Sequence, residues 1–293
     1  ENLLKDEIGK LERDLAAQTE HVKVREAEIT ALEAQISGYR MGFNRHKAKR
    51  DELHDKRKSL WGTESELNAE IERLKAEVVK AEKALDHATP GDIRRGISCV
   101  RRICRDYNIS GVYGSIIELL ECDENLFTAV EVTAGNSLFH VVVENDEIST
   151  QVIRHLNAEK GGRVTFIPLN RVKAPHVTYP KSSDVIPLLK KLKYSSNYDQ
   201  AFGQVFARTV ICRDLDVATR VARSDGLDCI TVEGDQVSKK GGMTGGFYDK
   251  RRSKLKLMNV IRQNAMAITA KENELQNVRS ELQNILYMSS HST

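Results

Sequence analysis

The chain has 293 residues, of which 30% are charged and 5% are aromatic, and its formal net charge is +3. This composition is typical of long exposed helices joined to one modest core, rather than of two ordinary globular domains. The small net charge gives no overall field that attracts nucleic acid, so any such contact must depend on a local patch. The five cysteines contain no CxxC pair, and their spacing indicates neither a zinc site nor a disulfide framework.

The start of the chain has no signal-peptide core, and no apolar run approaches the length of a membrane span. The first residue is Glu1 rather than Met, and we therefore expect the chain to be part of a longer protein. Cys212 and Cys229 stand inside apolar runs. We expect both to be buried thiols, which fits a reducing compartment.

Residues 1–88 are expected to form an N-terminal coiled-coil arm. Between Leu4 and Leu85, an alternating spacing of four and three residues places apolar side chains at eighteen of twenty-four positions. A straight helix drifts off a seven-residue repeat, so a seam that keeps one register for this long indicates a coiled coil. The register weakens between His46 and Arg57, which indicates a loosely packed stretch or, alternatively, a bend or partner contact.

A second, shorter seam predicts a C-terminal coiled-coil arm over residues 250–293. Its core positions are Met258, Ile261, Ala265, Ile268, Glu272, Leu275, Arg279, Leu282 and Leu286. Residues 50–85 and 258–286 are similar in length and flank the central region, so we expect them to pair antiparallel. Residues before about Phe43 would then have no partner within this chain.

Between the arms, residues 89–249 are expected to form an α/β domain. Helical patterns at 124–134, 148–157, 198–206 and 214–223 alternate with apolar runs of strand type at 112–120, 138–143, 164–169, 209–212 and 229–232. This alternation predicts two pseudo-repeated halves with mixed sheets, joined by a long connection at 170–183. Thr89 is expected to cap a helix whose first residue is Pro90.

No catalytic pattern is present in the sequence. The glycine-rich stretch lacks the Gly-Lys-Ser/Thr ending of a phosphate-binding loop, and the eight histidines have no metal-ligand spacing. Acidic residues cluster at 122–124 and 144–147, where they begin expected helices and interact favourably with the helix dipole. We therefore expect a chain without enzymatic activity and without a cofactor.

The most unusual stretch runs from Gly234 to Gly246 and has five glycines in thirteen residues. It is either a flexible hairpin leading into the second arm or a surface where a partner backbone approaches closely. The second interpretation predicts a dimer interface at Gly241, Gly242, Met243, Thr244, Gly245, Gly246 and Phe247.

Basic residues gather just after this stretch, at 250–256, and two more lie within it, at 239 and 240. A charge run is usually a solvated surface, but these residues lie where an arm meets the domain, and they could neutralise phosphates. The arginines at 94, 95, 101, 102 and 105, where the first arm enters the domain, could extend the same surface. The predicted DNA-binding residues are Lys239, Lys240, Lys250, Arg251, Arg252, Lys254 and Lys256.

Four motifs between two coils give a resemblance to a known family. They are AVEVTAGN at 129–136, TFIPLN at 165–170, ITVEGD at 230–235 and GGMTGG at 241–246. With these motifs in this order, the chain resembles the hinge region of the structural maintenance of chromosomes (SMC) family. The stretches at 130–136, 211–213, 228–238 and 246–249 are most similar to the third-subunit type of cohesin.

The resemblance implies arms that fold back on themselves and a hinge that pairs with the hinge of a second, cohesin SMC-one-type subunit. It implies a DNA-entrapping ring for sister-chromatid cohesion in the nucleus, with weak, sequence-independent DNA contact. The family's ATPase heads lie at the far ends of the arms, outside this chain. The alternative is a structural tether in which arms of two chains pair in parallel around an embedded α/β interaction domain.

Overall fold

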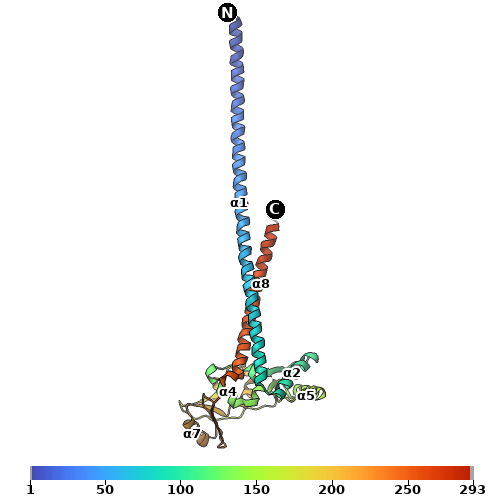
Figure 1. The fold of residues 1–293 in the computed structure, drawn as a ribbon, viewed down its shortest axis with the longest axis vertical. Helices are drawn as coiled ribbons and strands as arrows, with labels where there is room; N and C mark the ends of the chain where they lie inside the picture. The colour runs from blue at the N-terminus through green and yellow to red at the C-terminus, as the bar shows by residue number, and fades with distance from the viewer. Residues whose placement is uncertain (1, 291–293) are drawn as a thin grey trace. The chain divides into compact units, whose positions relative to one another are not determined.

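The computed structural model describes residues 2–290. The chain forms two compact units: the domain unit, Ile71–Ala270, and the arm unit, which comprises the residues up to Glu70 and from Lys271 onward. Two long helices contribute to both units, α1 (Asn2–Ala88) and α8 (Lys254–Ser290) (Figure 1). No helix among the described residues combines the length and apolar character needed to cross a membrane.

The two long helices pair antiparallel within one chain. In the arm unit, Lys56 contacts Glu281 at 3.4 Å, Glu64 contacts Arg279 at 2.8 Å, and Glu70 contacts Lys271 at 2.7 Å, measured between nitrogen and carboxylate oxygen. In the domain unit, the Asn264 side chain donates to Glu77 at 3.2 Å. Residue numbers rise on α1 as they fall on α8, which confirms the predicted fold-back. The alternative, arms pairing in parallel between chains, is wrong for this stretch.

The seam on α1 is confirmed where α8 covers it. Leu67 is buried in the arm unit, and Ile71, Leu74 and Ala81 are buried in the domain unit. Through the stretch of weak register α1 stays helical, and the Arg57 guanidinium lies 4.9 Å from the Trp61 ring centroid.

On α8, the predicted seam is wrong at four positions, because Ala265, Glu272, Arg279 and Leu286 are all exposed. The helix buries Val278 and Ile285 where the spacing predicted Arg279 and Leu286, and Leu286 is 50% exposed. A charged guanidinium is costly to bury in an apolar seam. Arg279 instead points to the flank and donates to Glu64, which was itself a predicted core position.

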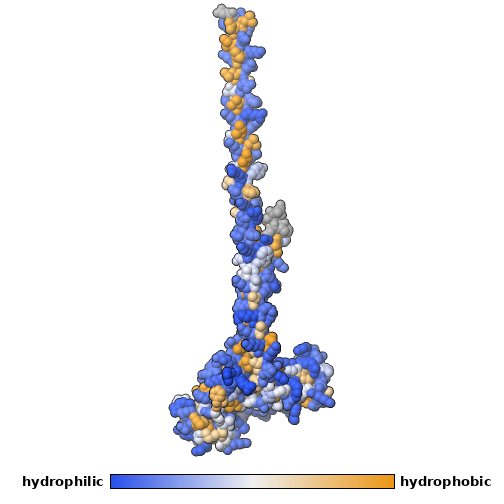
Figure 2. All heavy atoms as spheres, in the orientation of Figure 1, coloured by the Kyte–Doolittle hydropathy of each residue, from blue (hydrophilic) through white to orange (hydrophobic). Residues whose placement is uncertain are grey.

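The N-terminal part of α1 keeps an exposed apolar stripe, which Figure 2 shows as a line of hydrophobic side chains along the helix. Leu4, Leu11, Leu15 and Leu32 are all more than half exposed. These residues belong to the same seam that α8 covers further along. The seam predicted before Phe43 is therefore uncovered in the described part of the chain.

The domain unit contains two sheets whose first three strands pair in the same way. In the first sheet, β2 (Val141–Val143) pairs antiparallel with β1 (Val112–Ser115) and parallel with β3 (Phe166–Pro168). In the second, β5 (Thr209–Cys212) pairs antiparallel with β4 (Val185–Pro187) and parallel with β6 (Asp228–Ile230). The second sheet then adds β7 (Gln236–Val237) and β8 (Met243–Thr244), both antiparallel.

The crossover helices of the two halves start in the same way. In α5 (Asp146–Glu159), the Asn145 side chain accepts from the Ile148 amide at 2.9 Å. In α7 (Leu215–Asp225), the Asp214 side chain accepts from the Val217 amide at 2.8 Å. Such caps satisfy amides that have no partner within the helix. The repeated strand, helix, strand pattern confirms the predicted pseudo-duplication.

Shorter helices complete the domain unit. The α-helices are α2 (Gly91–Asp106), α3 (Ile116–Leu119), α4 (Phe127–Ala134) and α6 (Asp199–Phe206). The 3-10 turns are η1 (Glu124–Leu126), η2 (Gly135–Phe139), η3 (Leu188–Lys191), η4 (Ser196–Tyr198) and η5 (Lys250–Arg252).

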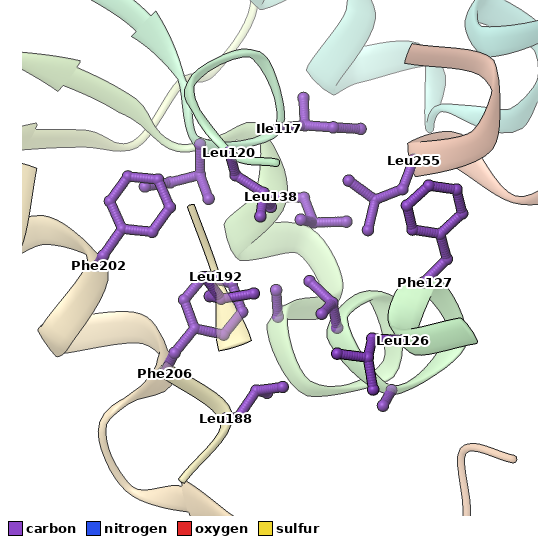
Figure 3. Close-up of a cluster of buried hydrophobic side chains, with 14 of the residues drawn as sticks. Ile117, Leu120, Leu126, Phe127, Leu138, Leu188, Leu192, Phe202, Phe206 and Leu255 are labelled. Carbon is purple, nitrogen blue, oxygen red and sulfur yellow. The ribbon is translucent and has the colours of Figure 1, made fainter. Parts of the chain in front are cut away.

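The two halves share one central core. Figure 3 labels Ile117, Leu120 and Leu138 of the first half, Phe202 and Phe206 of the second, and Leu255 of α8 in one buried cluster. Each half also has its own outer core, around Ile103 and Val152 in the first and around Cys212 and Cys229 in the second. The burial of both thiols confirms that prediction. The start of α8 is thus part of the central core.

Two local predictions are wrong. The strand expected over 112–120 ends at Ser115, because the Ser115 amide and hydroxyl both donate to the Glu118 carboxylate and start α3. Thr89 does not cap α2, since its hydroxyl donates back to the Leu85 carbonyl at 2.7 Å and Pro90 takes the cap position.

Candidate interface at the glycine segment

The glycine-rich stretch from Gly234 to Gly246, called the glycine segment from here on, contains a β-hairpin at the edge of the second sheet. In it, Gln236 is opposite Thr244 and Val237 is opposite Met243. The turn closes through the Ser238 amide, which donates to the Gly242 carbonyl at 2.7 Å, and Gly241 takes a φ of 93°, a left-handed conformation that favours glycine. Of the two strands, β8 is the outermost strand of its sheet.

The hairpin is held from its inner side by two aspartates. The Asp228 carboxylate oxygen Oδ1 accepts from the Ser238 hydroxyl at 3.2 Å and from the Lys239 amide at 3.0 Å. Asp235 Oδ1 accepts from the Gly246 amide at 3.2 Å. Side chains therefore hold the hairpin both at its turn and at its open end.

All seven residues predicted for the dimer interface lie on the surface in one continuous stretch. Met243 is 57% exposed and Phe247 is 94% exposed, although both are large and apolar. An edge strand with exposed apolar side chains is a ready template for pairing with another strand. Their role in pairing remains a prediction.

A shallow pocket of about 430 Å³ adjoins the end of the hairpin and is lined by Glu233 and residues 246–251. Phe247 is one of its walls. The pocket gives the surface an apolar recess beside charged rims, a combination found in protein interfaces.

The structure places the predicted DNA-binding residues in two groups. Lys239 and Lys240 are exposed in the hairpin turn, and the other five lie in η5 and the first turn of α8. Arg251 pairs with Asp249, its Nε donating at 2.9 Å, and this ion pair raises the pKa of the guanidinium and lowers that of the carboxyl. Lys250, Arg252 and Lys256 are also exposed, and Lys254 is half-buried.

Among the described residues, no group of three or more His, Cys, Asp or Glu side chains is arranged to hold a metal ion. The structure also reveals anchoring residues that the sequence did not, chiefly Asp228, Asp235 and Glu131. Asp235 follows Gly234, whose φ is 101°, and a Gly-Asp pair at the head of a glycine-rich stretch is the local signal that points to a turn.

Comparison with known proteins gives one consistent result. A model of the SMC proteins flexible hinge domain matches residues 109–222. Structural maintenance of chromosomes protein 3 of Arabidopsis thaliana is 64% identical over 97% of this chain and 24% of its own length. The chain spans a quarter or less of the length of the curated relatives it matches.

Solved structures agree. One described as the folded elbow of cohesin has a TM-score of 0.69 and 32% identity, over 84% of this chain and 36% of that one. An asymmetric dimer of the Geobacillus stearothermophilus SMC hinge domain has a TM-score of 0.55, over 81% of this chain and 98% of that one. Its identity is 19%, so this second likeness concerns the fold alone.

Proposed function

The chain belongs to the structural maintenance of chromosomes family, and on that premise we propose that its glycine segment pairs with the hinge of a second, cohesin SMC-one-type subunit. The proposal is supported by the relative that carries the name of the family's protein 3 and by the likeness to a structure described as the folded elbow of cohesin.

One observation carries the proposal. Among the described residues, no strand pairs with the outer edge of β8, and Met243 and Phe247 are exposed beside it. Backbone groups at such an edge can add a strand from a partner, while the apolar side chains give the contact its affinity. The neighbouring glycines let the partner backbone come close because they carry no side chain.

In the full-length protein, this pairing would join two folded-back arms at one end of a ring. ATPase heads at the other ends of the arms would close the ring around DNA, for sister-chromatid cohesion and chromosome organisation in the nucleus. The part described here would contribute pairing rather than catalysis, and it would need no cofactor.

We further propose that the hinge has a weak, sequence-independent contact with DNA. The support is the exposed cations in the hairpin turn and at the start of α8, next to the proposed pairing edge. Cations that neutralise phosphates contribute through counterion release and do not read the base sequence.

Light scattering after size exclusion tests the pairing. The chain mixed with a cohesin SMC-one-type hinge should give the mass of a one-to-one complex. A variant with Met243→Glu and Phe247→Glu should remain two separate species, whereas Met266→Glu, at a methionine that is 69% exposed on α8, should pair normally. Separate masses for the unmodified mixture, or normal pairing by the double variant, would overturn the proposal.

A further inference from the structure

A buried carboxylate lies behind the proposed pairing edge. Glu131, on α4, is 4% exposed, and its two oxygens accept three hydrogen bonds from donors far away in the sequence. Oε1 accepts from the Ser253 hydroxyl at 2.6 Å and from the Leu255 amide at 2.9 Å, and Oε2 accepts from the Tyr248 hydroxyl at 2.5 Å. All three donors are neutral groups, a tyrosine hydroxyl, a serine hydroxyl and a backbone amide.

The first oxygen, Oε1, binds the start of the C-terminal arm. Ser253 caps α8, accepting from the Lys256 amide at 3.1 Å while it donates to Glu131. In a common helix start, the third residue is acidic and its carboxylate completes the cap. Here that position holds Lys256, and a carboxylate from α4 contacts the helix start in a different way, by accepting from the Ser253 hydroxyl and the Leu255 amide. Glu131 thus supplies the negative charge that the helix dipole favours and that the cationic first turn lacks.

The second oxygen, Oε2, binds Tyr248, which lies just after the glycine segment. Tyr248 directly follows Phe247, which is the most exposed large apolar residue there. The Tyr248 hydroxyl nevertheless donates a hydrogen bond inward, to Glu131. Burial and the neighbouring Glu131 carboxylate raise the pKa of Tyr248, so it remains a hydrogen-bond donor at neutral pH. The two oxygens of Glu131 therefore fix both ends of residues 248–255.

We infer that Glu131 is a positioning residue that couples the pairing edge to the C-terminal arm. When a partner holds the segment around Phe247, Tyr248 is held on one oxygen, and the other oxygen keeps the first turn of α8 closed. Such coupling is reciprocal, so an ordered α8 start must favour pairing by the same factor. The part of the inference that concerns the partner rests on the proposed function.

The first experiment uses the chain without a partner and follows amide hydrogen exchange. Tyr248→Phe deletes one hydroxyl and keeps the ring, so the fold should survive. Because a buried carboxylate that loses a donor is less well held, exchange at the Leu255 and Lys256 amides should become faster by about threefold or more. Tyr107→Phe, at a half-exposed tyrosine stacked on His155, is the matched control and should leave these amides unchanged.

The reverse change completes this test. Ser253→Ala should speed exchange at the Gly246 and Tyr248 amides, although it alters only the arm end. Glu131→Gln should lie between the unmodified chain and Glu131→Ala, since an amide keeps one accepting oxygen and can donate to Tyr248. Unchanged or slower exchange at the far end in both Tyr248→Phe and Ser253→Ala would overturn the coupling.

The second experiment adds the partner hinge. In the unmodified chain, pairing should slow exchange at Leu255 and Lys256, and Tyr248→Phe should abolish this slowing even in the paired complex. If Glu131 had only a structural role, Tyr248→Phe would lower the melting temperature, but pairing would still slow exchange at Leu255 and Lys256. If no pairing occurs at all, the proposed function fails while the exchange result in the free chain still decides the coupling.

Discussion

Gly245 lies so close to Asp235 that a methyl group on Gly245 would overlap the Asp235 carboxylate oxygen. Gly246, the next residue, has a φ of 127° and donates its amide to the same oxygen. These two glycines are therefore required by the loop itself, whatever docks on it. Gly242 differs, because its φ is not left-handed and, apart from its chain neighbours, no atom of the described residues lies within 4 Å of the place where a side chain would begin.

This contrast separates folding from pairing. Gly242→Trp should weaken pairing with a partner hinge by about tenfold or more, because the new side chain blocks close approach, and the melting temperature should not change. Gly245→Ala should instead lower the melting temperature of the free chain. Calorimetry of the free chain and titration with the partner hinge measure the two effects. Normal affinity in Gly242→Trp would argue against close backbone approach at this glycine.

A second prediction concerns the seam of the arm unit. Ile285 is 4% exposed and Leu286 is 50% exposed, although the two are neighbours on α8. Ile285→Ala should lower the free energy of unfolding of the paired arm by about 2 kcal/mol or more. Leu286→Ala should change it by less than about 0.5 kcal/mol. Urea unfolding followed by circular dichroism measures both, and equal losses would restore the register that the sequence spacing suggested.

That shift of register shows what the spacing of apolar residues could not predict. The spacing of four and three was correct on α1 where α8 covers it, at Leu67, Ile71, Leu74 and Ala81. On α8, either Val278 or Arg279 could occupy the seam, because shifting the register by one residue gives a similar repeat. The choice depends on α1, where Glu64 forms an ion pair with Arg279 on the flank of the seam. Contacts between distant residues are not visible in the spacing of either helix.

The short strands were missed for a related reason. The sequence predicted β5 with correct ends, because Thr209–Cys212 is an unbroken apolar run between helices. It missed β7 and β8, which have two residues each and belong to a hairpin that Asp228 and Asp235 hold. It therefore located the glycine segment correctly but could not tell a held hairpin from a flexible connection. Glu131, which lies over a hundred residues from its partners, left no local signal.

The third prediction is a loss of stability in alkali. Burial, with the nearby Asp123 and Glu131 carboxylates, raises the pKa of the Cys122 thiol to about 12, and burial with Asp199 raises that of Tyr194 to about 12. A pKa that is higher in the folded state stabilises the fold below the unfolded value and loses this effect as the pH rises toward the folded value. The melting temperature should therefore fall steadily between about pH 9 and pH 12.

Cys122→Ala checks the contribution of the thiol. This variant should show a shallower decline of the melting temperature with pH than the unmodified chain, because one of the groups that must ionise is gone. Cys122 lines a pocket of about 190 Å³ with Lys193 and Arg262, so a small alkylating reagent can reach it. Rapid alkylation of Cys122 at pH 8 would contradict the raised pKa, since only the thiolate reacts.

The last prediction concerns DNA and the cations at the start of α8. Replacing Lys250, Arg251, Arg252, Lys254 and Lys256 by Glu should weaken DNA binding equally for all sequences, and each cation lost should reduce the salt slope by up to about 0.9 for duplex DNA. Glutamates at 254 and 256 favour the helix dipole, so the fold should survive. Partner-hinge pairing should persist, as a positive control. Equal affinities and salt slopes for both proteins would mean that these cations only solvate the surface.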